Sequence, residues 1–97
     1  MFQYNQNIPS GISDWNVSNV TSMRTCFGGC TNIDLDLSSW DTSSVKHMGN
    51  TFENTSFTSD PGINNWETGN VTNMFNTFKG SRFNYDIYKW DTSSVTI

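Results

Sequence analysis

The sequence contains no alanine and only two leucines, Leu35 and Leu37. Long helices, coiled coils and helical bundles are built largely from Ala, Leu, Glu and Lys, so this scarcity argues against all three. Hydrophobic residues make up 34% of the chain, compared with about 45–50% in an average globular domain. The chain has 4 Trp, 3 Tyr and 7 Phe. Aromatic side chains must therefore supply much of the core.

Basic residues are also few, with five Lys and Arg against nine Asp and Glu and a net charge of -4. They are too scattered to follow a phosphate backbone, which argues against nucleic acid as a partner. The chain has no run of 18 apolar residues, and its first residues lack the basic and apolar regions of a signal peptide. We therefore expect no direct membrane insertion of this segment.

The four tryptophans recur at nearly equal intervals. Trp15, Trp40, Trp66 and Trp90 are 25, 26 and 24 residues apart, and other apolar residues stand at fixed distances from each of them. Such periodicity indicates a repeat protein whose neighbouring units share one core. We expect a single repeat domain, 1–97, with units of approximately 1–29, 30–54, 55–80 and 81–97, the last incomplete. The repeated positions predict a structural core of Ile12, Trp15, Val20, Met23, Phe27, Leu37, Trp40, Val45, Met48, Phe52, Ile63, Trp66, Val71, Met74, Phe78, Ile87, Trp90 and Val95.

Two patterns within each unit predict its secondary structure. Apolar and polar residues alternate over 33–37 and 83–87, as in half-buried strands. Apolar residues at relative positions 0, +3 and +7 predict a short helix, for example over 71–78. Together these patterns predict an α/β fold. Its expected form is a short right-handed solenoid, with a narrow parallel sheet on one side and short helices on the other.

The phrase CTNIDLDLSSWDTSSVKHMGNTFENTSF, residues 30–57, resembles the BspA-like leucine-rich-repeat surface proteins, also described as mycoplasma-type lipoprotein repeats. The resemblance covers essentially the whole chain and implies that the expected α/β solenoid, of about 25 residues per repeat, is of the leucine-rich-repeat type. It implies an exported or surface-anchored protein that takes part in adhesion and has no enzymatic activity in its repeats. The chain departs from the family pattern where Met-Phe is usual, because it has Cys26-Phe27, Thr51-Phe52 and Thr77-Phe78.

The sequence offers little material for catalysis. His47 is the only histidine, and no nucleophile or phosphate-binding motif accompanies it. We therefore expect no enzyme, with no catalytic residue, no cofactor and no metal site. Cys26 and Cys30 lie four residues apart, which leaves open two partly buried thiols, a local disulfide or a metal site.

The alternating segments also predict a polar outer face. If the apolar residues of these segments point inward, their polar neighbours point outward. This face can be a solvated surface, a surface for a partner, or a Ca²⁺ site. The candidate partner-facing residues are Asn5, Asn7, Asp34, Asp36, Asp60, Asn84 and Asp86.

These expectations define one main function and one alternative. The main hypothesis is a non-enzymatic cell-surface interaction or adhesion module that presents its polar, acidic face to a protein or glycan of a host or matrix. The alternative is a purely structural segment of a larger surface protein that associates with itself through the solenoid ends. Both place the chain at the cell surface or outside the cell.

Overall fold

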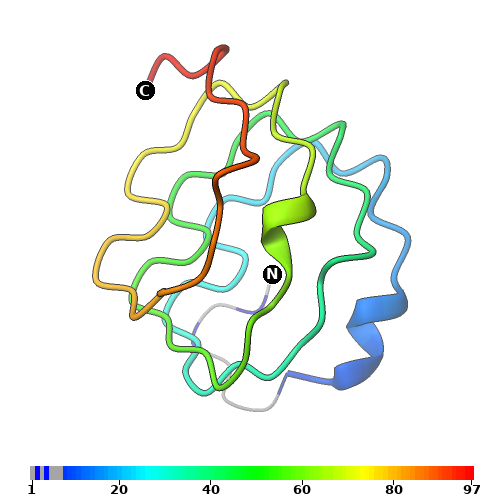
Figure 1. Ribbon diagram of the computed structural model, residues 1–97, viewed down its shortest axis with the longest axis vertical. Coiled ribbons are helices and arrows are strands. Elements are labelled where there is room, and N and C mark those ends of the chain that lie inside the picture. The colour runs from blue at the N-terminus through cyan, green and yellow to red at the C-terminus, as the bar shows by residue number, and fades with distance from the viewer. Residues whose placement is uncertain (1, 3, 5–7) are drawn as a thin grey trace.

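The computed structural model describes residues 2, 4 and 8–97, and most of this chain consists of turns and irregular segments (Figure 1). Within the described residues there are two short 3-10 helices, η1 over Ser10–Asp14 and η2 over Ile63–Asn65. Each ends one residue before a tryptophan, Trp15 or Trp66. The molecule measures 33 × 27 × 22 Å along its principal axes.

Segments about 25 residues apart lie side by side and are joined by a ladder of backbone hydrogen bonds. The amides of Met23, Thr25 and Phe27 donate to the carbonyls of residues 47, 49 and 51 at 2.8, 3.0 and 3.0 Å. The same ladder links the following pair of units, where Met48, Asn50 and Phe52 donate to residues 73, 75 and 77. The sequence repeat is therefore also a repeat of contacts.

Within each unit the chain turns every few residues. The amide of each tryptophan donates to the carbonyl three residues before it, as from Trp40 to Leu37 at 3.2 Å. A second turn precedes each recurring valine position, as from Val45 to Thr42 at 3.0 Å. Hydrogen bonds from residue i+3 to residue i are those of β-turns and 3-10 helices. Polar residues that favour turns supply the intervening positions.

The helix predicted over 71–78 and its equivalents in the other units are wrong. In the middle of each segment one residue has a left-handed backbone, with φ of 55° at Thr25, 58° at Asn50 and 53° at Asn76. A right-handed α-helix cannot pass through a left-handed residue. Asn is one of the residues that best tolerate this conformation, so the sequence specifies tight turns here.

The predicted solenoid of the leucine-rich-repeat type, with its narrow parallel sheet and layer of short helices, is also wrong. Among the described residues the only β-type pairings are three isolated parallel bridges, Ser22 with His47, His47 with Asn73, and Ile33 with Phe57. The strands expected over 33–37 and 83–87 are absent. Frequent turns keep extended runs too short for a sheet, and Pro61 has no amide hydrogen to donate.

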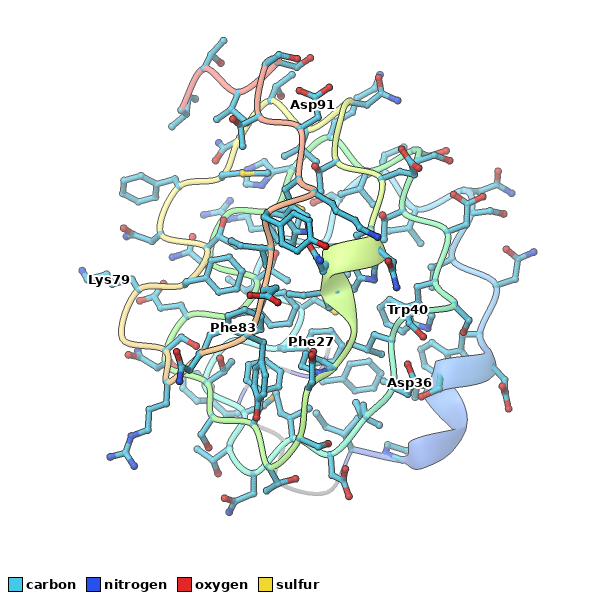
Figure 2. The ribbon with its side chains drawn as sticks, viewed as in Figure 1. Phe27, Asp36, Trp40, Lys79, Phe83 and Asp91 are labelled. Atoms are coloured by element: carbon cyan, nitrogen blue, oxygen red, sulfur yellow. The ribbon has the colours of Figure 1, made fainter. Side chains whose placement is uncertain are left out.

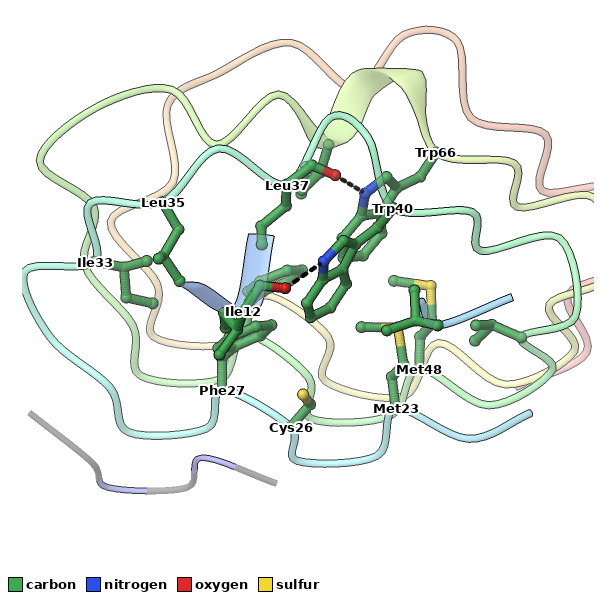
Figure 3. Packing of buried hydrophobic residues seen from close by; sticks show 14 of the residues in the cluster. Ile12, Met23, Cys26, Phe27, Ile33, Leu35, Leu37, Trp40, Met48 and Trp66 are labelled. Carbon is green, nitrogen blue, oxygen red and sulfur yellow. Dashed lines mark hydrogen bonds between the residues drawn. The ribbon is translucent and has the colours of Figure 1, made fainter. Parts of the chain in front are cut away.

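Trp40 and Trp66 connect successive units through hydrogen bonds and ring stacking. The indole Nε1–H of Trp40 donates to the Ile12 carbonyl at 2.9 Å, and that of Trp66 donates to the Leu37 carbonyl at 2.9 Å (Figure 3). The rings of Trp40 and Trp66 stack with centroids 6.1 Å apart and an interplanar angle of 7°. Each indole thus buries a large apolar surface and satisfies its polar atom.

Most of the predicted core positions lie inside the molecule. Met74 and Phe78 are half-buried, as are Val20, Ile87, Trp90 and Val95. Trp15 is the exception, because 48% of its surface is exposed. Its ring packs against Phe2 at a centroid distance of 5.6 Å. The fully buried members of the prediction are Ile12, Met23, Phe27, Leu37, Trp40, Val45, Met48, Phe52, Ile63, Trp66 and Val71.

The core also contains polar residues that the apolar pattern did not include. The Thr51 hydroxyl lies 2.9 Å from the Met23 carbonyl and 2.7 Å from the Met48 carbonyl. The Thr77 hydroxyl makes the corresponding contacts one unit later, at 3.0 and 2.8 Å. These threonine hydroxyls therefore link successive units by hydrogen bonds inside the core.

Candidate functional site

The candidate polar face keeps the alternation that the sequence predicts, even though no strand forms. Over 33–37 the burial alternates strictly, with Asp34 and Asp36 exposed between buried apolar neighbours. Over 83–87 the same alternation leaves Asn84 and Asp86 exposed. Asp60 is exposed in the intervening unit. The face therefore collects exposed polar side chains from three successive units.

Part of this face is engaged in local structure. One Asp36 carboxylate oxygen accepts hydrogen bonds from the amide and the hydroxyl of Ser38, at 3.0 and 2.6 Å. These bonds lower the pKa of Asp36, the Ser38 hydroxyl contributing most. Asp60 accepts the Gly62 amide at 2.9 Å. Such bonds to a residue two positions on are Asx turns, which fix the backbone.

The remaining candidates differ in how they are held. Asp34 accepts a hydrogen bond from the hydroxyl of Ser59 at 2.8 Å, which links two units across the face. Asn84 and Asp86 make no side-chain hydrogen bond within the part of the chain that the structure describes. Their polar atoms are therefore available to an external group. Asn5 and Asn7 lie outside the described residues.

The polar position after each tryptophan has a structural role. The carboxylates of Asp41 and Asp91 accept the amides of Ser43 and Ser93, at 3.0 and 2.9 Å. In the first unit the Asn16 amide oxygen does the same with the amide of Ser18. The hydrogen bonds of each serine lower the pKa of Asp41 and of Asp91. The repeated phrase Trp-Asp-Thr-Ser is thus the sequence of a turn.

The histidine and the two cysteines, which are the side chains best suited to catalysis or metal binding, are engaged in contacts within the folded structure. The His47 imidazole is half-buried, and its Nδ1 accepts the Gly49 amide at 3.0 Å. Cys26 and Cys30 are buried thiols, and burial raises the pKa of Cys26 to about 12. The Cys30 Sγ donates to the Phe2 carbonyl at 2.8 Å. A buried, protonated thiol is a poor nucleophile and a poor metal ligand.

Two polar pockets beside the left-handed turns were not predicted from the sequence. One of about 240 Å³ has the oppositely charged Arg24 and Glu53 in its lining, and the other of about 260 Å³ has His47 in its lining. The recurring Asn or Thr two residues after each methionine position was the signal that could have located them. The first is lined by Tyr4, Arg24, Thr25, Gly28, Gly29, Asn50, Glu53 and Asn54, and the second by Arg24, His47, Asn50, Asn73, Phe75 and Ile97.

Charged residues are spread over the surface. Figure 2 shows Lys79 extending outward from its turn, while Phe27 and Trp40 lie among the packed side chains. Among the described residues, no three His, Cys, Asp or Glu side chains come together as a metal site would need. No helix within residues 2, 4 and 8–97 has the length and apolar character needed to cross a membrane.

Comparisons with known proteins place the chain in a family. No curated protein and no solved structure gives a significant match. A family model does match, over residues 1–97, and its description is "Mycoplasma protein of unknown function, DUF285". This match confirms the mycoplasma-type character that the repeated phrase predicts. The chain belongs to the DUF285 family of mycoplasma proteins.

Proposed function

We propose that this protein is a non-enzymatic interaction module at the cell surface or outside the cell. In this proposal it is related to the BspA-like surface repeat proteins and binds a protein or glycan through its polar face. The observation that carries the proposal is the row of exposed Asp and Asn side chains on residues 33–37 and 83–87, which alternate with buried apolar residues in the first segment and with half-buried ones in the second. A rigid scaffold that holds variable polar groups outward is suited to recognition.

The chemistry of the face indicates the kind of partner. Asp86 and Asn84 have available acceptor and donor atoms, and the chain carries a net charge of -4. Carboxylates recognise cationic side chains, and Asp and Asn together recognise the hydroxyl groups of sugars. The partner is therefore a basic protein segment or a glycan of a host or matrix surface. The roles of His47 and Cys26 in the fold support a function without catalysis.

A binding array of glycans and matrix proteins tests this proposal. The 97-residue chain is expected to bind at least one class, and the double variant Asp34→Asn with Asp86→Asn is expected to weaken that binding by about tenfold or more. The matched control is Glu67→Gln with Asp91→Asn, which makes the same change in net charge at exposed positions outside the face. Asn at position 91 still accepts the turn hydrogen bond.

Two results would contradict the proposal. One is the absence of binding to any arrayed class by the folded chain. The other is an equal loss of affinity in both double variants, because that would show a response to net charge alone and not to the face. Near-ultraviolet circular dichroism establishes that each variant is folded before it is applied to the array.

A further inference from the structure

The indole hydrogen bond between successive units recurs at three internal interfaces, and the stacking of tryptophan rings recurs at two of them. The indole Nε1–H of Trp90 donates to the Ile63 carbonyl at 2.7 Å, repeating the bonds that Trp40 and Trp66 make to the units before them. The rings of Trp66 and Trp90 stack with centroids 6.4 Å apart and an interplanar angle of 4°. Each unit thus presents a donor and a ring on one side, and an acceptor and a ring on the other.

A second aromatic column runs beside the tryptophans. Phe27 and Phe52 stack at 5.6 Å and 1°, and Phe52 and Phe78 stack at 5.5 Å and 9°. Phe2 continues this column on the other side of Phe27, at 5.6 Å and 18°. Because every member of the column packs on an equivalent ring, each end of the column is itself a surface that fits another such ring.

The two end faces of the molecule carry complementary halves of this interface. On one face, Trp15 is 48% exposed, and its indole N–H has no acceptor among residues 2, 4 and 8–97. On the other face, Trp90 and Phe78 are half-buried. The Ile87 carbonyl, which stands where internal units accept an indole, accepts only the Trp90 amide among the described residues, at 3.0 Å.

We propose that the 97-residue chain associates head to tail with further copies of itself through these two faces. The Trp15 ring of one copy packs on the Trp90 ring of the next, its indole N–H donates to the Ile87 carbonyl, and Phe2 packs on Phe78. The contact reproduces an interface that the fold already contains between its own units. Because the two faces are different, each added copy leaves one face of each kind open, and the assembly grows beyond a dimer.

Charge at the position before each tryptophan favours the same arrangement. This position holds Asp14, Ser39, Asn65 and Lys89 in successive units, and the Lys89 ammonium lies 3.5 Å from the Asn65 amide oxygen. Asp14 and Lys89 are both exposed. Head-to-tail contact places Asp14 of one copy beside Lys89 of the next. Contact between two identical faces would instead place like charges together.

This association uses the ends of the molecule and leaves Asp34, Asn84 and Asp86 uncovered. It therefore adds to the proposed partner binding and does not depend on it. A chain that binds an arrayed partner but never associates would contradict only the present inference. A chain that associates but binds no partner would contradict only the proposed function.

Sedimentation velocity of the 97-residue chain from micromolar to millimolar concentration tests the inference. The weight-average mass is expected to rise continuously with concentration, past that of a dimer. Trp15→Phe keeps a ring but removes the indole donor, so it should weaken association by about three- to tenfold. A strictly monomeric chain at millimolar concentration, or growth that stops at the dimer, would overturn the proposal.

Charge reversal provides a test that does not alter the aromatic packing. Asp14→Lys and Lys89→Asp each place like charges at the contact, so each variant alone should associate less than the natural chain. In an equimolar mixture, every contact between the two different variants joins a lysine to an aspartate, so mixing should restore association. Two single variants that associate as strongly as the natural chain, or a mixture that stays as weak as its components, would contradict the head-to-tail contact.

Discussion

The middle and the end of the molecule use the same sequence phrase but differ in how deeply its tryptophan is buried. Trp40 and Trp66 are 4% and 2% exposed, whereas Trp15 is 48% exposed. The rings of Trp40 and Trp66 stack on each other, whereas the Trp15 ring packs against Phe2. The burial of a residue in a repeat protein thus depends on its neighbours. Residues of the same type at equivalent positions can therefore contribute different amounts to stability.

Replacing a middle and an end tryptophan measures this difference directly. Trp40→Ala removes a buried ring and its bond to the Ile12 carbonyl, so it should lower the free energy of unfolding by about 3–5 kcal/mol. Trp15→Ala removes a half-exposed ring, so it should cost only about 1–2 kcal/mol. Chemical denaturation at low micromolar concentration measures both values without a contribution from association. Equal losses of unfolding free energy at the two positions would show that the contribution of a tryptophan to stability does not depend on its neighbours.

Thr51 provides a smaller test in the middle of the molecule. Thr51→Val keeps the shape of the side chain but removes a hydroxyl in contact with two backbone carbonyls. Both carbonyls keep one bond to a backbone amide, so we expect a loss of about 1–2 kcal/mol. Thr92→Val is the matched control, since Thr92 is exposed and its hydroxyl makes no hydrogen bond within the described residues, so this change should alter stability by less than about 0.5 kcal/mol. A loss at Thr51 no larger than that of the control would contradict a role for these hydroxyls in joining units.

The first left-handed turn differs from its counterparts in the middle. Thr25 occupies a position that Asn50 and Asn76 fill in later units, and all three have positive φ. A β-branched residue is strained in this conformation, whereas Asn tolerates it. Thr25→Asn should therefore stabilise the fold by roughly 0.5–1 kcal/mol. Asn50→Thr should destabilise it by a similar amount. Thermal unfolding of the two variants measures both effects, and shifts of the same sign would contradict the explanation.

The sequence predicted the composition of the core better than the shape of the backbone. Apolar periodicity located Phe27, Leu37 and Trp40 inside the molecule because burial depends mainly on side-chain chemistry and spacing. It failed for the helix over 71–78, since an apolar spacing of 0, +3 and +7 also fits a series of tight turns. Asn76 is the residue that distinguishes a series of turns from a helix, but a pattern based on apolar residues does not include it.

The candidate face was predicted in the same partial way. Alternation placed Asp34, Asp36 and Asp86 on the surface, and the structure agrees that they are exposed. It could not separate residues that a turn engages, such as Asp36, from residues that remain available, such as Asp86. That distinction depends on the serine two positions after Asp36, and Asp86 is followed there by Tyr88.

Ser43 tests the smallest of these effects, in the turn after Trp40. The Ser43 hydroxyl and amide lower the pKa of Asp41, so folding favours the ionised carboxylate. Stability from this group is therefore fully present above the unfolded pKa of about 3.9 and is lost as the pH falls through the lower folded pKa. Ser43→Ala removes the hydroxyl, and the pKa of Asp41 should rise toward its ordinary value. Carboxyl NMR titration measures this change, with Ser44→Ala as the neighbouring control. A pKa of Asp41 that does not move in Ser43→Ala, or that moves equally in both variants, would show that the turn hydroxyl is not its cause.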